Sequence, residues 1–180
     1  MSEPITTQEK EVSLTKDAVI KEAKRIEENC MHSAKGHFVV AHFWNNFHLW
    51  IGIPSVALAA LAGAAAFAKF DTNNIIAGIL SIIVVVLTSI ATFLNPKERY
   101  SVHLTSGNNY DSLITRARIF WTIECSRENS EEILTSRLKD LSDHRDRLNR
   151  ESPQIPRWAY LKAKKGIEAG EANYKVDAEK

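Results

Sequence analysis

The chain has 180 residues, of which 44% are hydrophobic and 25% are charged, and its formal net charge is +1. A nearly neutral chain offers no strongly basic surface for nucleic acid, and seven glycines without a glycine-rich loop argue against a phosphate-cradling motif. The charges are segregated, since between Lys35 and Lys97 the only charged side chains are Lys69 and Asp71. The middle of the chain therefore suits an apolar medium, and both ends suit water.

Residues 1–36 are predicted to form an N-terminal amphipathic helix. Thr15 is the expected N-cap, because its hydroxyl can accept a hydrogen bond from the first helical turn. Gly36 is expected to bend the chain before the apolar region. Apolar side chains recur between them at helical spacing, at Ala18, Val19, Ala23, Ile26 and Cys30.

Residues 37–96 are predicted to hold an interfacial segment and a two-helix transmembrane hairpin. A helix rises 1.5 Å per residue, so crossing a hydrocarbon core of about 30 Å takes roughly 20 apolar residues. Residues 48–68 and 74–94 are both long enough, and neither carries the charged face of a soluble helix. We therefore favour two transmembrane helices over the alternative, a hairpin buried inside a soluble protein.

Aromatic residues gather where the first span begins, at Trp44, Phe47, His48 and Trp50. Amphipathic rings prefer the headgroup level of a bilayer, so this cluster is typical of an interfacial belt. Pro54 follows within the span and is expected to kink or delimit the helix.

Basic residues beside the spans predict the orientation. Lys21, Lys24, Arg25 and Lys35 precede the first span, and Lys97, Arg99, Arg116 and Arg118 follow the second. The connecting loop has only Lys69, which Asp71 offsets, so the positive-inside rule places both termini in the cytoplasm. Cys30 and Cys125 then lie in a reducing compartment, where a structural disulfide is not expected.

Residues 97–151 are predicted to be a cytoplasmic helical region. Pro96 should mark a kink or a helix junction, and Ser130 should cap a new helix that has Glu131 and Glu132 in its first turn. The apolar positions of the first part are Tyr110, Leu113, Ile114, Ala117, Phe120 and Trp121; those of the second are Leu134, Leu138, Leu141 and Leu148. The leucines fit a heptad seam, for which packing inside a bundle is favoured over self-association.

Residues 152–180 are predicted to form a proline-containing linker, followed by a C-terminal helix and tail. The overall fold class is therefore an all-α membrane protein, a transmembrane hairpin with cytoplasmic helices on both sides.

A mildly polar stripe runs along the second span. Asn74, Ser81, Thr88 and Asn95 are seven residues apart, with Gly78 and Thr92 on the same face and bulky aliphatic residues opposite. Two explanations stay open: the stripe lines an aqueous pore in an oligomer, or it mediates helix packing. The first span carries a small-residue row at Ser55, Ala59 and Gly63, which favours close helix packing.

No pattern in the chain predicts catalysis, a cofactor or a metal. His32, His37, His42 and His48 are spaced by five or six residues, so they do not stack on one helical face, and no Cys or carboxylate completes a zinc motif. No ionisable residue lies deep inside either span. We therefore do not expect an enzyme.

The order of features resembles a SLATT-domain protein, in which an N-terminal helix, a two-helix membrane hairpin and a helical cytoplasmic segment follow one another. His103, Gly107, Tyr110 and Leu113 in "NPKERYSVHLTSGNNYDSLITRARIF" are similar to that family's juxtamembrane pattern. "RENSEEILTSRLKDLSDHRDRLN" and "SPQIPRWAYLKAKKGI" resemble its downstream helix and proline-containing end, so the resemblance covers roughly residues 20–167.

The resemblance implies a pore-forming effector of bacterial conflict systems, located in the inner membrane and acting in antiviral defence. It implies a homo-oligomer in the lipid bilayer that a cytoplasmic nucleotide sensor or second-messenger system controls, and it supplies no catalytic residues. The alternative is a membrane scaffold that conducts nothing and holds a cytoplasmic partner through the Leu134–Leu148 seam. A membrane-bound enzyme is the third class.

Overall fold

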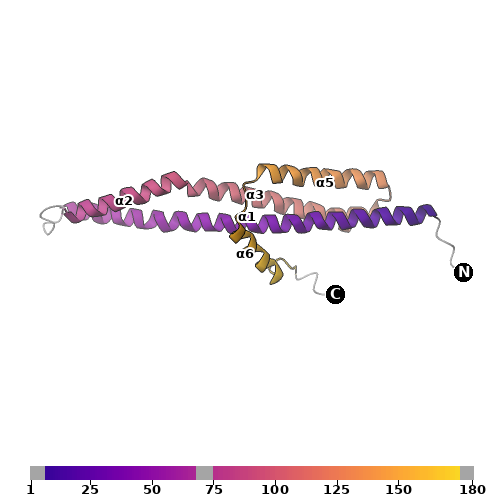
Figure 1. Cartoon of the computed structure of the whole chain (residues 1–180), viewed down its shortest axis with the longest axis horizontal. Coiled ribbons are helices and arrows are strands. Elements are labelled where there is room, and N and C mark those ends of the chain that lie inside the picture. The colour runs from indigo at the N-terminus through magenta and orange to yellow at the C-terminus, as the bar shows by residue number, and fades with distance from the viewer. Residues whose placement is uncertain (1–6, 68–74, 175–180) are drawn as a thin grey trace. The chain divides into compact units, whose positions relative to one another are not determined.

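The computed structural model describes residues 7–67 and 75–174, and the side chains from residue 15 onward. These residues form helices and connecting segments without a strand, so the fold is all-helical over the described ranges (Figure 1). The α-helices are α1 (Thr7–Phe67), α2 (Ile75–Leu94), α3 (Pro96–Ile119), α4 (Cys125–Arg127), α5 (Glu131–Glu151) and α6 (Arg157–Glu168), and a π-helical segment, η1, covers Phe120–Glu124.

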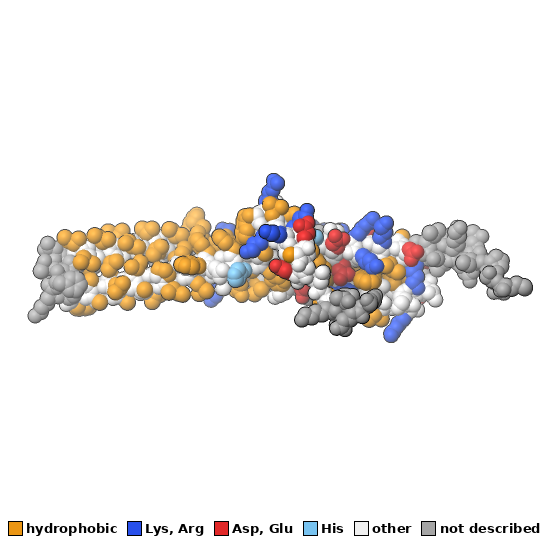
Figure 2. Space-filling view, turned by 90° about the horizontal axis from the view of Figure 1, so that it is seen from below, with side chains coloured by type: hydrophobic (Ala, Val, Ile, Leu, Met, Phe, Trp, Pro, Cys, Tyr) orange, Lys and Arg blue, Asp and Glu red, His pale blue; other side chains and the backbone are white. Residues whose placement is uncertain are grey.

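The chain divides into two compact units. Unit 1 consists of Met1–Val39 and His103–Lys180, and unit 2 consists of Val40–Val102. Hydrophobic side chains dominate the surface of unit 2, whereas most of the acidic and most of the basic side chains lie on unit 1 (Figure 2). The segregation of charge in the sequence therefore corresponds to two structural units.

The first helix is longer than the sequence predicted. Thr15 does not cap it, because α1 has already begun at Thr7, and the helix continues through Gly36 and Pro54 without ending at either. Gly36 serves close packing instead of a bend. A β-carbon at this position would lie 3.0 Å from Cδ1 of Ile155, so the missing side chain lets the linker before α6 approach α1.

Unit 1 has an apolar core of two clusters, built from the faces that the periodicity predicted. Of the α1 positions, Val19, Ala23, Ile26 and Cys30 are buried, and Ala18 is exposed. Tyr110, Leu113, Ile114, Ala117 and Phe120 face them from α3 and η1. Burying each large apolar side chain contributes about 1.5–3 kcal/mol, which is why these helices pack together.

The heptad leucines of α5 pack inside unit 1. Leu134 and Leu148 are buried, and Leu138 and Leu141 pack against both core clusters. Ser130 is the N-cap of α5, as predicted, and its hydroxyl accepts a hydrogen bond from the backbone N–H of Ile133. α5 ends at Glu151 and α6 begins at Arg157, so residues 152–156 connect the two helices.

A π-helical turn was not predicted and has a clear physical reason. The backbone N–H of Cys125 donates to the carbonyl of Phe120, five residues earlier, so one residue is added to the turn. With ordinary helical spacing, Glu124 would follow Phe120 into the core. The wider turn buries Cys125 instead and leaves the carboxylate of Glu124 partly exposed, where it pairs with Arg137.

Unit 2 contains the apolar part of α1 and the whole of α2, which lie side by side (Figure 1). Both helices are long and apolar enough to cross a membrane. In their most apolar 18-residue stretches only 17% and 6% of residues are buried, unlike the core helices of a soluble protein. The residues that are least exposed form what we call the pairing seam: Ile51, Gly52, Pro54, Ser55, Leu58, Ala62 and Ala65 on α1, and Ala77, Leu80, Val84, Leu87, Ala91 and Leu94 on α2.

The junction that Pro96 predicted lies between α2 and α3. Asn95 separates the two helices with a positive φ of 43°, a conformation that asparagine tolerates better than most residues. Arg99 holds the junction, because its Nε donates to the carbonyl of Leu94 at 2.8 Å and its guanidinium lies over the ring of Trp44 at 5.0 Å.

We predict that Gly107→Ala destabilises unit 1. A β-carbon at Gly107 would lie 2.7 Å from Cε1 of Phe38, so the ring must move, at a cost of about 1–3 kcal/mol that exceeds the gain of up to about 1 kcal/mol in helix propensity. Thermal unfolding of the detergent-solubilised chain, followed by circular dichroism, should show a lower Tm. Gly63→Ala is the matched control, because nothing lies within 4 Å of that position. An equal Tm change in both variants would contradict the close packing at Gly107.

Candidate functional site

The polar stripe of α2 is exposed in this structure. Ser81, Thr88, Thr92 and Asn95 are all exposed, and Asn74 lies outside the described residues. Each of these four follows a seam residue directly, as Ser81 follows Leu80 and Thr88 follows Leu87. One residue turns the helix by about a quarter of a revolution, so the stripe lies beside the pairing seam and takes no part in it.

Every hydroxyl of the stripe is satisfied by its own helix. Ser81 donates to the carbonyl of Ala77, Thr88 to that of Val84 and Thr92 to that of Thr88, each at 2.8 Å. An unpaired hydroxyl in hydrocarbon would cost several kcal/mol, and these bonds remove that cost. The hydroxyl oxygens keep lone pairs that can accept hydrogen bonds from water or from another helix.

The small-residue row of α1 does not pack as a unit within the chain. Ser55 is buried in the pairing seam, whereas Ala59 and Gly63 are exposed. Positions four apart on a helix drift by about 40° per step, which carries the second and third residues out of the seam. Ala62 and Ala65 are buried instead: Ala62 is seven residues after Ser55 and returns to within about 20° of its direction, and Ala65 follows about one turn later.

A buried histidine pair in unit 1 is the feature that the sequence did not predict. Nδ1 of His37 and Nδ1 of His103 are 2.9 Å apart, and both rings are buried. Tyr110 stacks on His37 with ring centroids 5.6 Å apart and an interplanar angle of 16°, and its hydroxyl donates to Oδ1 of Asn149. The pair joins α1 to α3 across 66 positions of sequence, which no local pattern reveals.

The residues of the juxtamembrane pattern all lie at this pair or next to it. His103 and Tyr110 contact His37, Gly107 lies against Phe38, and Leu113 is fully buried in the adjoining core. The spacing of the histidines along α1 argued against a metal site. The partner of His37 is His103 of α3, so the sequence signal for this pair was the presence of His103 in the juxtamembrane pattern.

The geometry requires at least one neutral imidazole. A hydrogen bond between two Nδ1 atoms needs one of them to carry a proton and the other to accept, so the accepting ring is neutral. Burial, and after it the charge of His103, lower the pKa of His37 to about 4. At neutral pH His37 is therefore uncharged, and the pair forms a polar contact within the core.

The other candidate histidines are not brought together with this pair. His32 lies against the ring of Tyr160, His42 bonds to Asn46, and His48 is exposed. Within the described ranges, no group of three His, Cys, Asp or Glu side chains could hold a metal ion. Burial also raises the pKa of the Cys30 thiol to about 11, so it is not an activated nucleophile.

Comparisons with protein-family models, curated proteins and solved structures found no match for this chain.

We predict that acid destabilises unit 1 through His37. Between about pH 6.5 and 4 the unfolded chain binds a proton at this position and the folded chain does not, so the free energy of unfolding falls as the pH is lowered, by up to about 3 kcal/mol. His37→Gln should flatten this part of the pH profile, measured by thermal unfolding from pH 4 to 7.5. His48→Gln, at an exposed position, is the control and should keep the wild-type slope. An unchanged slope in His37→Gln would show that other groups carry the pH dependence.

Proposed function

We propose that the chain is a membrane effector that oligomerises and forms a pore through the bacterial inner membrane. The observation that carries this proposal is the exposed polar stripe on α2, a helix long and apolar enough to span a bilayer. A pair of helices cannot enclose a channel, so several copies must assemble around the conducting path. The proposed lining consists of Ser81, Thr88, Thr92 and Asn95, together with Asn74, which lies outside the described residues.

The arrangement of unit 2 supports a helix pair with small and hydroxyl residues on one side. The stripe residues of α2 follow seam residues by one position, and so do Ala59, Gly63 and Ala66 on α1. In two antiparallel neighbours that share a seam, positions related to it in this way fall on the same side of the pair. Small and hydroxyl residues would then share one side, suited to close helix contact or to water, and bulky aliphatic residues the other, suited to lipid.

The hydrogen bonds of the stripe fit a protein with two states. Because each hydroxyl donates within α2, a single chain can rest in lipid without an unsatisfied donor. In an assembly the same oxygens can accept from water along the path. A signal drives the transition only by binding the assembled state more tightly than the resting one.

The wider setting rests on the resemblance and on the charge pattern. The resemblance to SLATT-domain proteins supports antiviral defence and control by a cytoplasmic nucleotide-sensing partner. Basic residues flanking the spans support two cytoplasmic termini in a multi-pass inner-membrane protein. In the alternative, a scaffold would bind its partner through the leucines of α5. These leucines pack inside unit 1, which leaves less apolar surface for a partner.

We predict that Ser81→Leu/Thr88→Leu abolishes ion leakage. Leucines remove the hydroxyls and make the path apolar, so the rate of depolarisation should fall by roughly tenfold or more. The measurement is membrane potential in bacteria after induced expression, with each variant brought to the same amount in the membrane. Ile82→Leu/Val86→Leu changes the opposite aliphatic face and should behave like the wild type.

The outcomes separate the competing hypotheses. Depolarisation by both double variants would keep a pore and reject this lining. A wild-type chain that leaves the potential unchanged, even together with its signalling partner, would favour the scaffold.

A further inference from the structure

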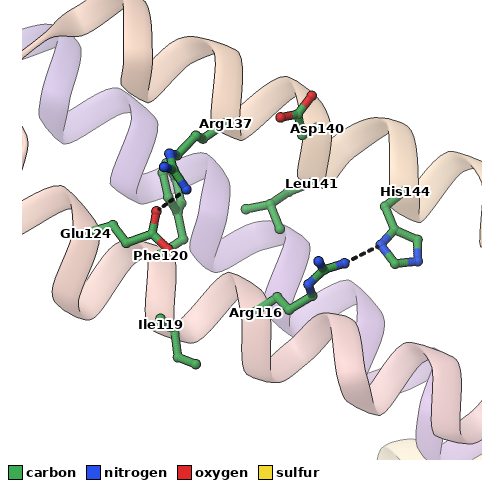
Figure 3. A pocket seen from close by; sticks show the side chains of 8 residues that line it. All are labelled: Arg116, Ile119, Phe120, Glu124, Arg137, Asp140, Leu141 and His144. Atoms are coloured by element: carbon green, nitrogen blue, oxygen red, sulfur yellow. Dashed lines mark hydrogen bonds and ion pairs between the residues drawn. The ribbon is translucent and has the colours of Figure 1, made fainter.

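A cavity of about 330 Å³ lies between the end of α3, the π-helical segment and α5, within unit 1 (Figure 3). Its volume is at the lower end of the range for small-molecule sites. The apolar part of its lining consists of Ile119, Phe120 and Leu141, and the polar part consists of Arg116, Glu124, Arg137, Asp140 and His144. The cavity therefore offers an apolar surface with charged groups around it.

The π-helical turn builds one wall of this cavity. It buries Phe120 and places Glu124 at the edge, where Oε2 lies 3.0 Å from Nη1 of Arg137. π-helical turns interrupt the regular hydrogen bonding of an α-helix, and they often occur at functional sites. This ion pair occupies one end of the cavity (Figure 3).

The other end has a guanidinium with a weak partner. Nη1 of Arg116 donates to Nδ1 of His144 at 3.3 Å, a long hydrogen bond to a neutral acceptor. Among the described side chains, no carboxylate pairs with Arg116, and the carboxylate of Asp140 is turned away from it (Figure 3). Arginine binds oxyanions strongly through charge-assisted and often bidentate hydrogen bonds, so an oxyanion would be a better partner than this imidazole.

We infer that this cavity binds a small organic anion, with its phosphoryl or carboxylate group on Arg116 and His144 and its apolar body on Leu141 and Phe120. The site is separate from the histidine pair and from the stripe of α2. It does not depend on whether the chain conducts ions. A ligand held in this way would contact both α3 and α5, and would stabilise the packing of these helices.

Binding should take up a proton at His144. The pKa of this side chain is lowered by burial first, then by Arg147 and Arg116, while Glu151 raises it. The carboxylates that line the cavity are those of Asp140 and Glu124. An oxyanion on Arg116 offsets the repulsion from that guanidinium and accepts a hydrogen bond from the imidazolium, so both effects raise the pKa of His144.

Phenyl phosphate is the probe that tests the site, since it combines an oxyanion with an apolar ring. Calorimetric titration of the detergent-solubilised full chain should show saturable binding, tighter than that of inorganic phosphate. Arg116→Met should weaken it by roughly tenfold or more, because a charge-assisted bond is lost. Arg150→Met, which changes an exposed arginine of α5 outside the cavity, should bind like the wild type.

A second measurement uses the wild-type chain alone and does not depend on the folding of a variant. Titrations near pH 6.5 in buffers of different ionisation enthalpy should reveal proton uptake on binding, which His144→Gln should remove. Absence of saturable binding at about 10 mM phenyl phosphate would overturn the inference, since specific affinities are tighter than this. Equal binding by wild type, Arg116→Met and Arg150→Met would also overturn it, because it would indicate general attraction to basic residues.

Discussion

The polar groups of the two apolar helices are satisfied within their own helices, and much of unit 2 depends on this constraint. Ser55, Ser81, Thr88 and Thr92 each donate to a carbonyl one turn earlier, as does Ser89. A polar stripe can therefore stay exposed to an apolar medium at little cost. The pairing seam then needs only apolar and small side chains, which leaves the polar stripe available for another copy or for water.

In unit 1 the helices bury polar side chains between them, and these side chains need hydrogen-bond partners within the core. The imidazoles of His37 and His103 satisfy each other, and Tyr110 covers the first and bonds to Asn149. A fully satisfied polar contact in a core costs little and restricts the register of the helices that make it. Gly36 and Gly107 also restrict how the segments pack. Ile155 lies against the first and Phe38 against the second, and a larger residue at either glycine would displace that side chain.

Local sequence signals predicted the elements well where one residue type decides the matter. Ser130 begins α5 and Pro96 begins α3, because a hydroxyl cap and a missing N–H act within one turn. The predictions at Thr15 and Gly36 were wrong, because they also considered only one turn of helix. Packing against other helices stabilises α1, which therefore continues through both positions. The π-helical turn was invisible locally, because its cause is the exclusion of Glu124 from a core formed by distant residues.

The sequence by itself determined the separation of charged from apolar segments, the all-helical class, the apolar faces and the existence of the polar stripe, because composition and periodicity are properties of each segment alone. Only the tertiary structure decided which faces pair. The seam of α2 passes beside the stripe, and His37 meets a histidine from another helix, because packing compares all faces of all helices at once. The cavity beside Arg116 likewise exists only where α3 and α5 meet, so the sequence of one segment alone could not predict it.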